Sequence, residues 1–194
     1  MTTLSVVIPA RNEGENIAAL VRAIDAALQA HQPFEIIVVD DGSTDDTAAR
    51  VRAMGLAHVR LLRHPVSAGQ SAAVHSGVLA ARAPLICTLD GDGQNPPEEL
   101  PRLIAPLLAD AAGLVGLVAG QRVKRQDTWS KKLASRLANA LRGWMLQDGT
   151  RDTGCGLKAF RRDAFLALPY FNHMHRYLPA LFARDGWQVA HVDV

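Results

Sequence analysis

The 194-residue sequence predicts an α/β fold in which helices cover both faces of a mostly parallel sheet. Two observations support this prediction. Strand-like apolar runs alternate with helix-like segments between residues 4 and 119, an order typical of parallel strands joined by crossover helices. Several of these runs, such as residues 85–89, are mainly apolar at successive positions, which indicates strands buried on both faces.

The same pattern gives each element in chain order. Each expected strand is a short apolar run followed by Gly, Pro or polar residues, and each expected helix has apolar residues at helical spacing. The elements are strand 4–8, helix 16–30, strand 35–39, helix 44–54, strand 58–62, helix 70–81, strand 85–89, helix 98–109 and strand 114–119. Ser43 or Thr44 suits the N-cap of the second helix, with Asp45 and Asp46 in its first turn.

Right-handed crossovers place the loops after the first, second and fourth strands of this order at one edge of the sheet. Open α/β sheets bind ligands at such an edge, where the strand order reverses. All three loops are polar, so the sequence predicts a binding site there.

Composition excludes several classes of protein. Apolar residues make up 48% of the chain and the net charge is +2, without a dense basic run interleaved with aromatics, so a nucleic-acid partner is not expected. Cys87 and Cys155 are the only cysteines, and neither spacing nor context indicates a disulfide framework. No basic leader precedes the first strand, so we expect a cytoplasmic protein.

The longest apolar region, residues 103–120, is not expected to span a membrane. Pro106, Asp110 and Gly113 interrupt it, so it is predicted to form a helix followed by a strand.

The strand at residues 85–89 is followed by two carboxylates one residue apart, Asp90 and Asp92. Two carboxylates this close repel each other unless a positive charge lies between them, and a hard divalent cation that takes oxygen ligands meets this need. Gln94 offers a third oxygen. The motif therefore indicates a Mg²⁺ site, and the alternative reading is an ordinary polar turn.

The loop after the first strand, residues 9–16, lacks the G-x-G-x-x-G pattern of dinucleotide-binding folds, which argues against a nicotinamide enzyme. Glu13 could accept hydrogen bonds from a base or a ribose, and Arg11 could stack on a flat ring. The alternative is a helix N-terminus that carries acidic residues for its own stability. In the second loop, Asp40 and Asp41 follow a buried strand, where one could accept an N–H from a nucleobase and the other hold the loop.

Three segments, residues 6–13, 36–45 and 89–98, together resemble the inverting family 2 glycosyltransferases of the GT-A fold. The closest resemblance within them is to the polyprenyl-phosphate glycosyltransferases, the dolichyl-phosphate mannose synthase group, which share the Asp-x-Asp-x-Gln motif followed by Pro. Arg11 stands where that family often has Tyr.

The resemblance implies a nucleoside diphosphate sugar donor, a UDP- or GDP-sugar, lying across these loops. The residues implied around the donor are Pro9, Arg11, Glu13, Val39, Asp41, Asp90, Gly91 and Asp92. Those implied to hold Mg²⁺ or Mn²⁺ are Asp90, Asp92 and Gln94. It further implies one GT-A domain over residues 1–194, with a nucleotide-sugar half (1–120) and an acceptor half (121–194).

The acceptor half contains a locally basic segment, residues 129–144, with Trp at both ends and Lys131, Lys132 and Arg136 between them. Its spacing fits either an interfacial helix or a helix that packs on the core and exposes a basic face. The resemblance favours an anionic membrane surface at the cytoplasmic face, because the family's acceptor is a polyprenyl phosphate. Residues 187–194 resemble the strand after which family members often continue with a segment that reaches the donor phosphates, so the chain is expected to be truncated at its C-terminus.

The expected reaction is inverting transfer of a sugar from the nucleotide to a polyprenyl phosphate. Asp152 matches the family's acidic position near the acceptor, and Arg122 is the candidate for a second contact to phosphate. A phosphate acceptor is already ionised near pH 7, so Asp152 would orient it, whereas a sugar hydroxyl acceptor would need Asp152 as a base. A nucleotidyltransferase lacks support because residues 9–16 are not a Gly-rich basic loop, and an inactive nucleotide-sugar or lipid-surface binding module is the remaining alternative.

Overall fold

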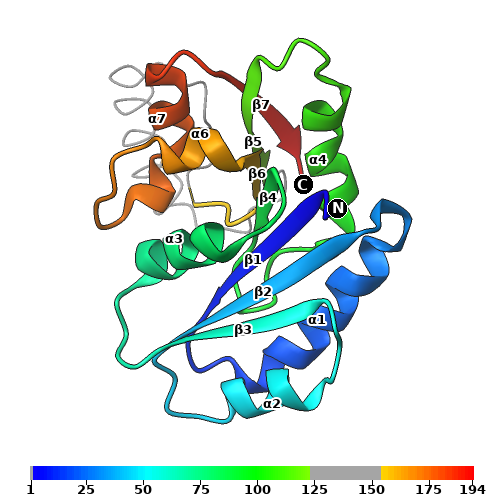
Figure 1. Ribbon diagram of the computed structural model, residues 1–194, viewed down its shortest axis with the longest axis vertical. Helices are drawn as coiled ribbons and strands as arrows, with labels where there is room; N and C mark the ends of the chain where they lie inside the picture. The colour runs from blue at the N-terminus through cyan, green and yellow to red at the C-terminus, as the bar shows by residue number, and fades with distance from the viewer. Residues whose placement is uncertain (1, 123–153) are drawn as a thin grey trace, which may run out of the picture.

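A computed structural model describes residues 2–122 and 154–194, and within these ranges the chain forms one seven-stranded sheet flanked by helices (Figure 1). The strands are β1 (Leu4–Ala10), β2 (Phe34–Asp41), β3 (Val59–His64), β4 (Leu85–Thr88), β5 (Val115–Gln121), β6 (Lys158–Arg161) and β7 (Gln188–Asp193). The α-helices are α1 (Gly14–Ala27), α2 (Thr47–Ala53), α3 (Gln70–Ala80), α4 (Leu100–Ala109), α6 (Arg162–Leu166) and α7 (Leu178–Arg184). The 3₁₀ helices are η1 (Gln29–His31), η2 (Pro97–Glu99) and η3 (Met174–Arg176).

The sheet has the strand order β3-β2-β1-β4-β6-β5-β7. The pairs β1–β2, β1–β4, β2–β3 and β5–β7 are parallel, whereas β6 is antiparallel to both β4 and β5. The predicted mostly parallel sheet is therefore confirmed. Strand β6 was not predicted from the sequence, because its four residues carry too weak a strand pattern to be recognised alone. Its register pairs Thr88 with Lys158, so β6 begins beside the end of β4.

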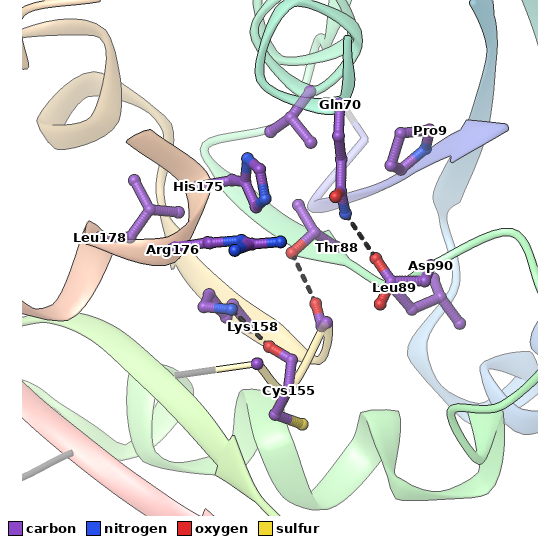
Figure 2. Close-up of a pocket in the computed structure, with 13 residues that line it drawn as sticks. Pro9, Gln70, Thr88, Leu89, Asp90, Cys155, Lys158, His175, Arg176 and Leu178 are labelled. Carbon is purple, nitrogen blue, oxygen red and sulfur yellow. Dashed lines mark hydrogen bonds between the residues drawn. The ribbon is translucent and has the colours of Figure 1, made fainter. Parts of the chain in front are cut away.

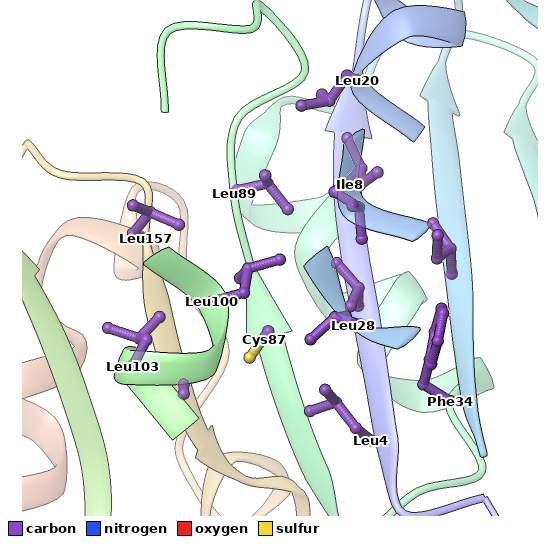
Figure 3. Packing of buried hydrophobic residues seen from close by; sticks show 14 of the residues in the cluster. Leu4, Ile8, Leu20, Leu28, Phe34, Cys87, Leu89, Leu100, Leu103 and Leu157 are labelled. Carbon is purple, nitrogen blue, oxygen red and sulfur yellow. The ribbon is translucent and has the colours of Figure 1, made fainter. Parts of the chain in front are cut away.

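Helices cover both faces of the sheet, as predicted. Figure 1 shows α1, α2 and α4 on one side and α3, α6 and α7 on the other. Alternate residues of β1 serve the two cores: Val6 and Ile8 pack with α1 and α4, whereas Val7 packs with α3. Figure 3 shows the first core, where leucines of α1 and α4 lie over β1 and β4. Each such side chain contributes about 1.5–3 kcal/mol by leaving water.

The second helix begins later than the sequence indicated, at Thr47. The Asp45 carboxylate accepts hydrogen bonds from the Thr47 N–H at 3.0 Å and from the Gly14 N–H at 2.9 Å. Residues 44–46 therefore form a bend in which the Asp45 side chain is hydrogen-bonded to the first residue of α2 and to the first residue of α1. This tertiary contact replaces the expected first helical turn.

Other findings concern the cysteines and possible membrane spans. Cys87 and Cys155 are both buried, and neither forms a disulfide. Among the residues that the structure describes, no helix is long and apolar enough to cross a bilayer.

Close packing of α3 on the sheet gives a stability prediction. A Cβ added to Gly77 would lie 2.3 Å from Cγ1 of Val7, so Gly77→Ala should lower the free energy of unfolding by about 1–3 kcal/mol through overpacking. Urea denaturation would measure the change. Leu79→Ala on the same helix is the control, because Leu79 is 54% exposed and its loss should cost less than about 0.5 kcal/mol. A more stable Gly77→Ala protein, as helix propensity alone would give, would contradict this packing.

Candidate active site

Two cavities open at the edge of the sheet where β1, β2 and β4 end. The first, here called the β2-side cavity, has a volume of about 380 Å³. Its walls include Pro9, Ala10, Arg11, Glu13, Asp41, Ser67, Gly69, Gln70, Ala73, Asp90, Gly91 and Asp92. The second, the β6-side cavity, has a volume of about 400 Å³. Its walls include Pro9, Gln70, Val74, Thr88, Leu89, Asp90, Gly154, Cys155, Gly156, Lys158, His175, Arg176 and Leu178. Pro9, Gln70 and Asp90 belong to both, so Asp90 lies at the boundary between the two cavities.

The first two loops of this edge are bound to each other. The Asn12 N–H donates to Ser43 Oγ at 2.9 Å, and Asn12 Oδ1 accepts the Thr44 N–H at 2.9 Å. The Glu13 N–H donates to Thr47 Oγ1, also at 2.9 Å. Asn12 adopts a left-handed backbone conformation with φ of 57°, which Asn tolerates better than most residues. These contacts fix the wall that carries Arg11 and Glu13.

Asp41 ends β2 with its carboxylate fully engaged. It accepts hydrogen bonds from Ser67 Oγ at 2.7 Å, from the Ala68 N–H at 2.8 Å and from the Gly69 N–H at 2.9 Å, and it contacts His64 Nδ1 at 2.7 Å. Burial opposes ionisation, but these hydrogen bonds outweigh it and lower the pKa of Asp41 to about 2. Asp41 thus holds the segment before α3 against the end of β2.

The neighbouring Asp40 is also used within the fold. Its side chain is completely buried, and Oδ1 accepts the Ser43 N–H at 2.9 Å. Its other oxygen, Oδ2, lies 3.1 Å from Arg63 Nε. Asp40 therefore shapes the second loop.

Asp90 follows β4 and is held from three sides. Gln70 Nε2 donates to Oδ1 at 2.7 Å, and Asn95 Nδ2 lies 3.3 Å from Oδ2. A Cβ at Gly156 would come within 2.3 Å of Oδ2, so only glycine leaves room for the carboxylate there. Burial raises the pKa of Asp90, and the nearby negative charge of Asp92 adds to this effect.

The donor chemistry of this pair fits a divalent cation. Asp90 and Asp92 bring carboxylate oxygens to the same turn, and burial of Asp90 together with the negative charge of Asp92 opposes ionisation of Asp90. A hard cation such as Mg²⁺ or Mn²⁺ would relieve that repulsion, and Mg²⁺ commonly uses one or two carboxylates with substrate phosphates and water. The residues present therefore fit the expected metal.

The β6-side cavity has a different chemistry, shown in Figure 2. Thr88 Oγ1 donates to the Gly156 carbonyl at 3.1 Å, and Lys158 Nζ donates to the Cys155 carbonyl. His175 and Arg176 project into the cavity from η3, opposite β4.

His175 is held by α3 in this cavity. Its Nδ1 lies 2.7 Å from the Oγ of the buried Ser71. Burial lowers the pKa of His175 to about 4, and the charges of Lys158, Arg176 and His173 contribute to the shift. The imidazole is consequently neutral at pH 7.

The structure brings together most of the residues predicted from the sequence. Those that line the β2-side cavity are Pro9, Arg11, Glu13, Asp41, Asp90, Gly91 and Asp92. Val39 is fully buried in the core that β2 forms with α3, Gln94 is exposed, and Arg122 follows β5. None of these three side chains belongs to the walls of either cavity. Their predicted contacts with base, metal and phosphate stay predictions. Asp152 and the basic segment at residues 129–144 lie outside the described residues.

Sequence reasoning missed several residues of the site. Gln70 and Ser71 begin α3, Lys158 begins β6, and His175 and Arg176 belong to η3. The cluster of histidines and arginine at residues 173–176, flanked by aromatic residues, was the available signal for the last pair. None of these residues lies in one of the three polar loops that were expected at the edge of the sheet.

The chain belongs to glycosyl transferase family 2, whose family model matches residues 5–168. Its fold is the predicted GT-A fold. Similar solved structures include glucosyl-3-phosphoglycerate synthase from Mycobacterium tuberculosis in complex with UDP, which is 28% identical with a TM-score of 0.77. That similarity covers 99% of this chain and 70% of the mycobacterial chain.

Two curated relatives are named for lipid phosphates. The chain is 39% identical over 193 residues to an undecaprenyl-phosphate 4-deoxy-4-formamido-L-arabinose transferase from Sodalis glossinidius, covering 96% of this chain and 58% of that protein. It is 36% identical over 186 residues to a dodecaprenyl-phosphate galacturonate synthase from Rhizobium johnstonii, covering 93% of this chain and 54% of that protein. The chain thus spans little more than half the length of these relatives.

The Asp41 hydrogen bonds predict a pH-dependent contribution to stability. Because the folded pKa of about 2 lies below the ordinary value of 3.8, the contribution is present above pH 4 and is lost as the pH falls towards 2. Asp41→Asn should lower the free energy of unfolding at pH 7 by at least about 2 kcal/mol, and the gap from wild type should shrink below pH 4. Urea denaturation between pH 3 and pH 7 tests this. Asp46→Asn, at an exposed ion pair with Arg50, should change stability by less than about 1 kcal/mol.

Because the Asp90 carboxylate occupies the space beside Gly156, we expect a larger residue at position 156 to impair nucleotide binding without unfolding the protein. Gly156→Ala places a methyl group where the Asp90 carboxylate lies, so Mn²⁺-dependent UDP binding should weaken about tenfold or more as the carboxylate is displaced. Isothermal titration with Mn²⁺ and with EDTA would separate metal-dependent from metal-independent binding. Unchanged Mn²⁺-dependent affinity, with a normal melting temperature, would show that the position of Asp90 does not matter for nucleotide binding.

Proposed function

We propose that this chain is the catalytic domain of an inverting glycosyltransferase that transfers a sugar from a nucleoside diphosphate sugar to a polyprenyl phosphate. The main support is the arrangement at the edge of the sheet, where one carboxylate, Asp90, separates two cavities of different chemistry. A transferase needs two substrates on opposite sides of the reacting sugar. The names of the two curated relatives support the choice of a lipid phosphate as acceptor.

The donor nucleotide is assigned to the β2-side cavity. Arg11 offers a planar cation for stacking, and Glu13 offers a carboxylate for base or ribose hydroxyl and N–H groups. Asp41 shapes this cavity through the segment that it holds. A uridine donor is favoured, because a similar structure, 26% identical with a TM-score of 0.76, contains Mn²⁺ and UDP-glucose.

Asp90 and Asp92 are assigned to hold Mg²⁺ or Mn²⁺, with Gln94 as a further oxygen donor. When bound, the metal supplies positive charge that stabilises the leaving diphosphate. The protein holds Asp90 ready for this task through Gln70 and Asn95.

The reaction forms one bond and breaks one bond at the anomeric carbon. An oxygen of the acceptor phosphate attacks that carbon, and the bond to the diphosphate oxygen breaks on the opposite face, so that the nucleoside diphosphate leaves with the bonding electron pair. The charge develops through an oxocarbenium-like transition state. Because a phosphate monoester is largely ionised at pH 7, a strong base is unnecessary and Asp152 is assigned to orient the acceptor.

The place of action follows from the acceptor. A polyprenyl phosphate resides in a membrane, so the protein is proposed to work peripherally at the cytoplasmic face, with the basic segment at residues 129–144 near anionic lipid. Attraction of this kind amounts to about 1 kcal/mol per basic residue near the surface.

Loss of one carboxylate should separate metal binding from folding. In Asp92→Asn, Mn²⁺-dependent UDP binding should fall at least about tenfold, because one anionic ligand is removed from a two-carboxylate site. Isothermal titration with UDP and GDP, each with and without Mn²⁺, would measure this and the base preference. Glu98→Gln is the matched control, since Glu98 is an exposed acid nearby that lines neither cavity. Equal losses in both variants, or none in Asp92→Asn, would refute the metal assignment.

A further inference from the structure

We propose that the β6-side cavity binds the phosphate end of an amphiphilic acceptor through Arg176 and His175, and that three exposed aromatic rings of the same segment of the chain contact its apolar part. This inference rests on the proposed function and deepens it, since it assigns residues to both parts of the acceptor. The three aromatic residues are Tyr170, Phe171 and Tyr177.

Arg176 is the first part of the argument. It lines the cavity and projects towards Thr88 at the end of β4 (Figure 2). Among the hydrogen bonds and ion pairs of the described residues, none engages its guanidinium, whereas Arg161 and Arg162 both bond to backbone carbonyls. A guanidinium presents a rigid fork of N–H donors that matches two phosphate oxygens. Arg176 is therefore available for an oxyanion in the cavity.

His175 adds a neutral donor beside that cation. The Ser71 hydroxyl is buried at the first turn of α3, where no preceding helical carbonyl is available to it, and a buried hydroxyl needs an acceptor. The backbone N–H of His175 is directed at Ser71 Oγ, with N and Oγ 3.5 Å apart, so we assign the Ser71 hydrogen to His175 Nδ1, which lies 2.7 Å from Oγ. Nδ1 then accepts and Nε2 carries the ring hydrogen. The imidazole thus presents an N–H to the cavity.

Charge in the cavity favours an anion on this side of Asp90. The Lys158 side chain is buried in the cavity wall, and its charge, like that of Arg176, acts on His175. Among the described residues that line this cavity, Lys158 and Arg176 are the cations and Asp90 is the carboxylate, a balance that favours binding of an oxyanion.

The aromatic residues point to an apolar chain attached to that oxyanion. Tyr170, Phe171 and Tyr177 are 48%, 39% and 42% exposed, although they belong to the short segment that carries His175 and Arg176. The Phe171 and Tyr177 rings pack together with centroids 6.3 Å apart, and Tyr177 directly follows Arg176. Exposed aromatic rings beside a phosphate-binding group are typical of surfaces that meet lipid, where an apolar body lies next to a polar end.

The test uses probes that separate phosphate from chain. Isothermal titrations on the whole chain, with UDP and Mn²⁺ present, would compare farnesyl phosphate, dimethylallyl phosphate, inorganic phosphate and farnesol. Wild type should bind farnesyl phosphate best and farnesol hardly at all. Arg176→Gln should weaken binding of both prenyl phosphates about 10- to 100-fold, the usual effect of losing a charged hydrogen-bonding partner. Arg176→Lys should restore part of this loss.

The chain contacts and the imidazole have their own variants. Phe171→Ser should weaken binding of farnesyl phosphate by about fivefold while leaving dimethylallyl phosphate unchanged, because only the longer chain reaches the ring. His175→Phe should weaken both prenyl phosphates, and His175→Gln should weaken them less, because its amide retains an N–H donor. Melting temperatures report any loss of folding, and Arg184→Gln, an exposed ion-paired residue of α7, is the matched control.

The outcomes separate this inference from the proposed function. If wild type binds UDP with Mn²⁺ but Arg176→Gln leaves prenyl phosphate binding unchanged, the inference is overturned and the donor assignment stands. The same holds if Arg176→Gln weakens UDP and prenyl phosphate equally, since the cavity would then serve the donor diphosphate. Inorganic phosphate binding as tightly as farnesyl phosphate would overturn the chain contact. If wild type binds neither UDP nor a prenyl phosphate, the proposed function itself fails.

Discussion

The buried carboxylate of Asp41 fixes the segment on which both cavities depend. Four donors meet its two oxygens, and three of them come from residues 67–69, directly before α3. The side chains of the next two residues are thereby positioned. Gln70 is hydrogen-bonded to Asp90, and Ser71 is hydrogen-bonded to the imidazole of His175. One ionised group at the end of β2 thus orients side chains on both sides of the boundary between the cavities.

Electrostatics distinguishes the two sides of the site. The proposed transfer of a sugar from a diphosphate to a phosphate must bring two anions to one carbon, although like charges repel. Carboxylates with metal-ligand chemistry lie at the β2-side cavity, whereas Lys158 and Arg176 lie at the β6-side cavity. Separate positive charges for the two anions would reduce their repulsion, and Asp90 at the boundary would discourage either anion from entering the other's position.

The antiparallel strand β6 explains how the later part of the chain reaches this edge. It runs between β4 and β5, and its register places Lys158 opposite Thr88, two residues before Asp90. Gly156 just before it allows the backbone to approach the carboxylate of Asp90. A short reversed strand therefore adds a second wall to a site whose first wall comes from parallel strands and their loops.

The sequence by itself determined the alternating layers, the mostly parallel strands and the main residues of the β2-side cavity. These features follow from local patterns: apolar periodicity defines strands and helices, and the carboxyl ends of parallel strands meet at one edge, so Glu13, Asp41 and Asp90 could be placed together. Tertiary structure alone decided the β6-side cavity and the late start of α2. Both depend on hydrogen bonds between residues far apart in the chain, such as those of Ser71 with His175 and Gly14 with Asp45, which leave no periodic signal in the sequence.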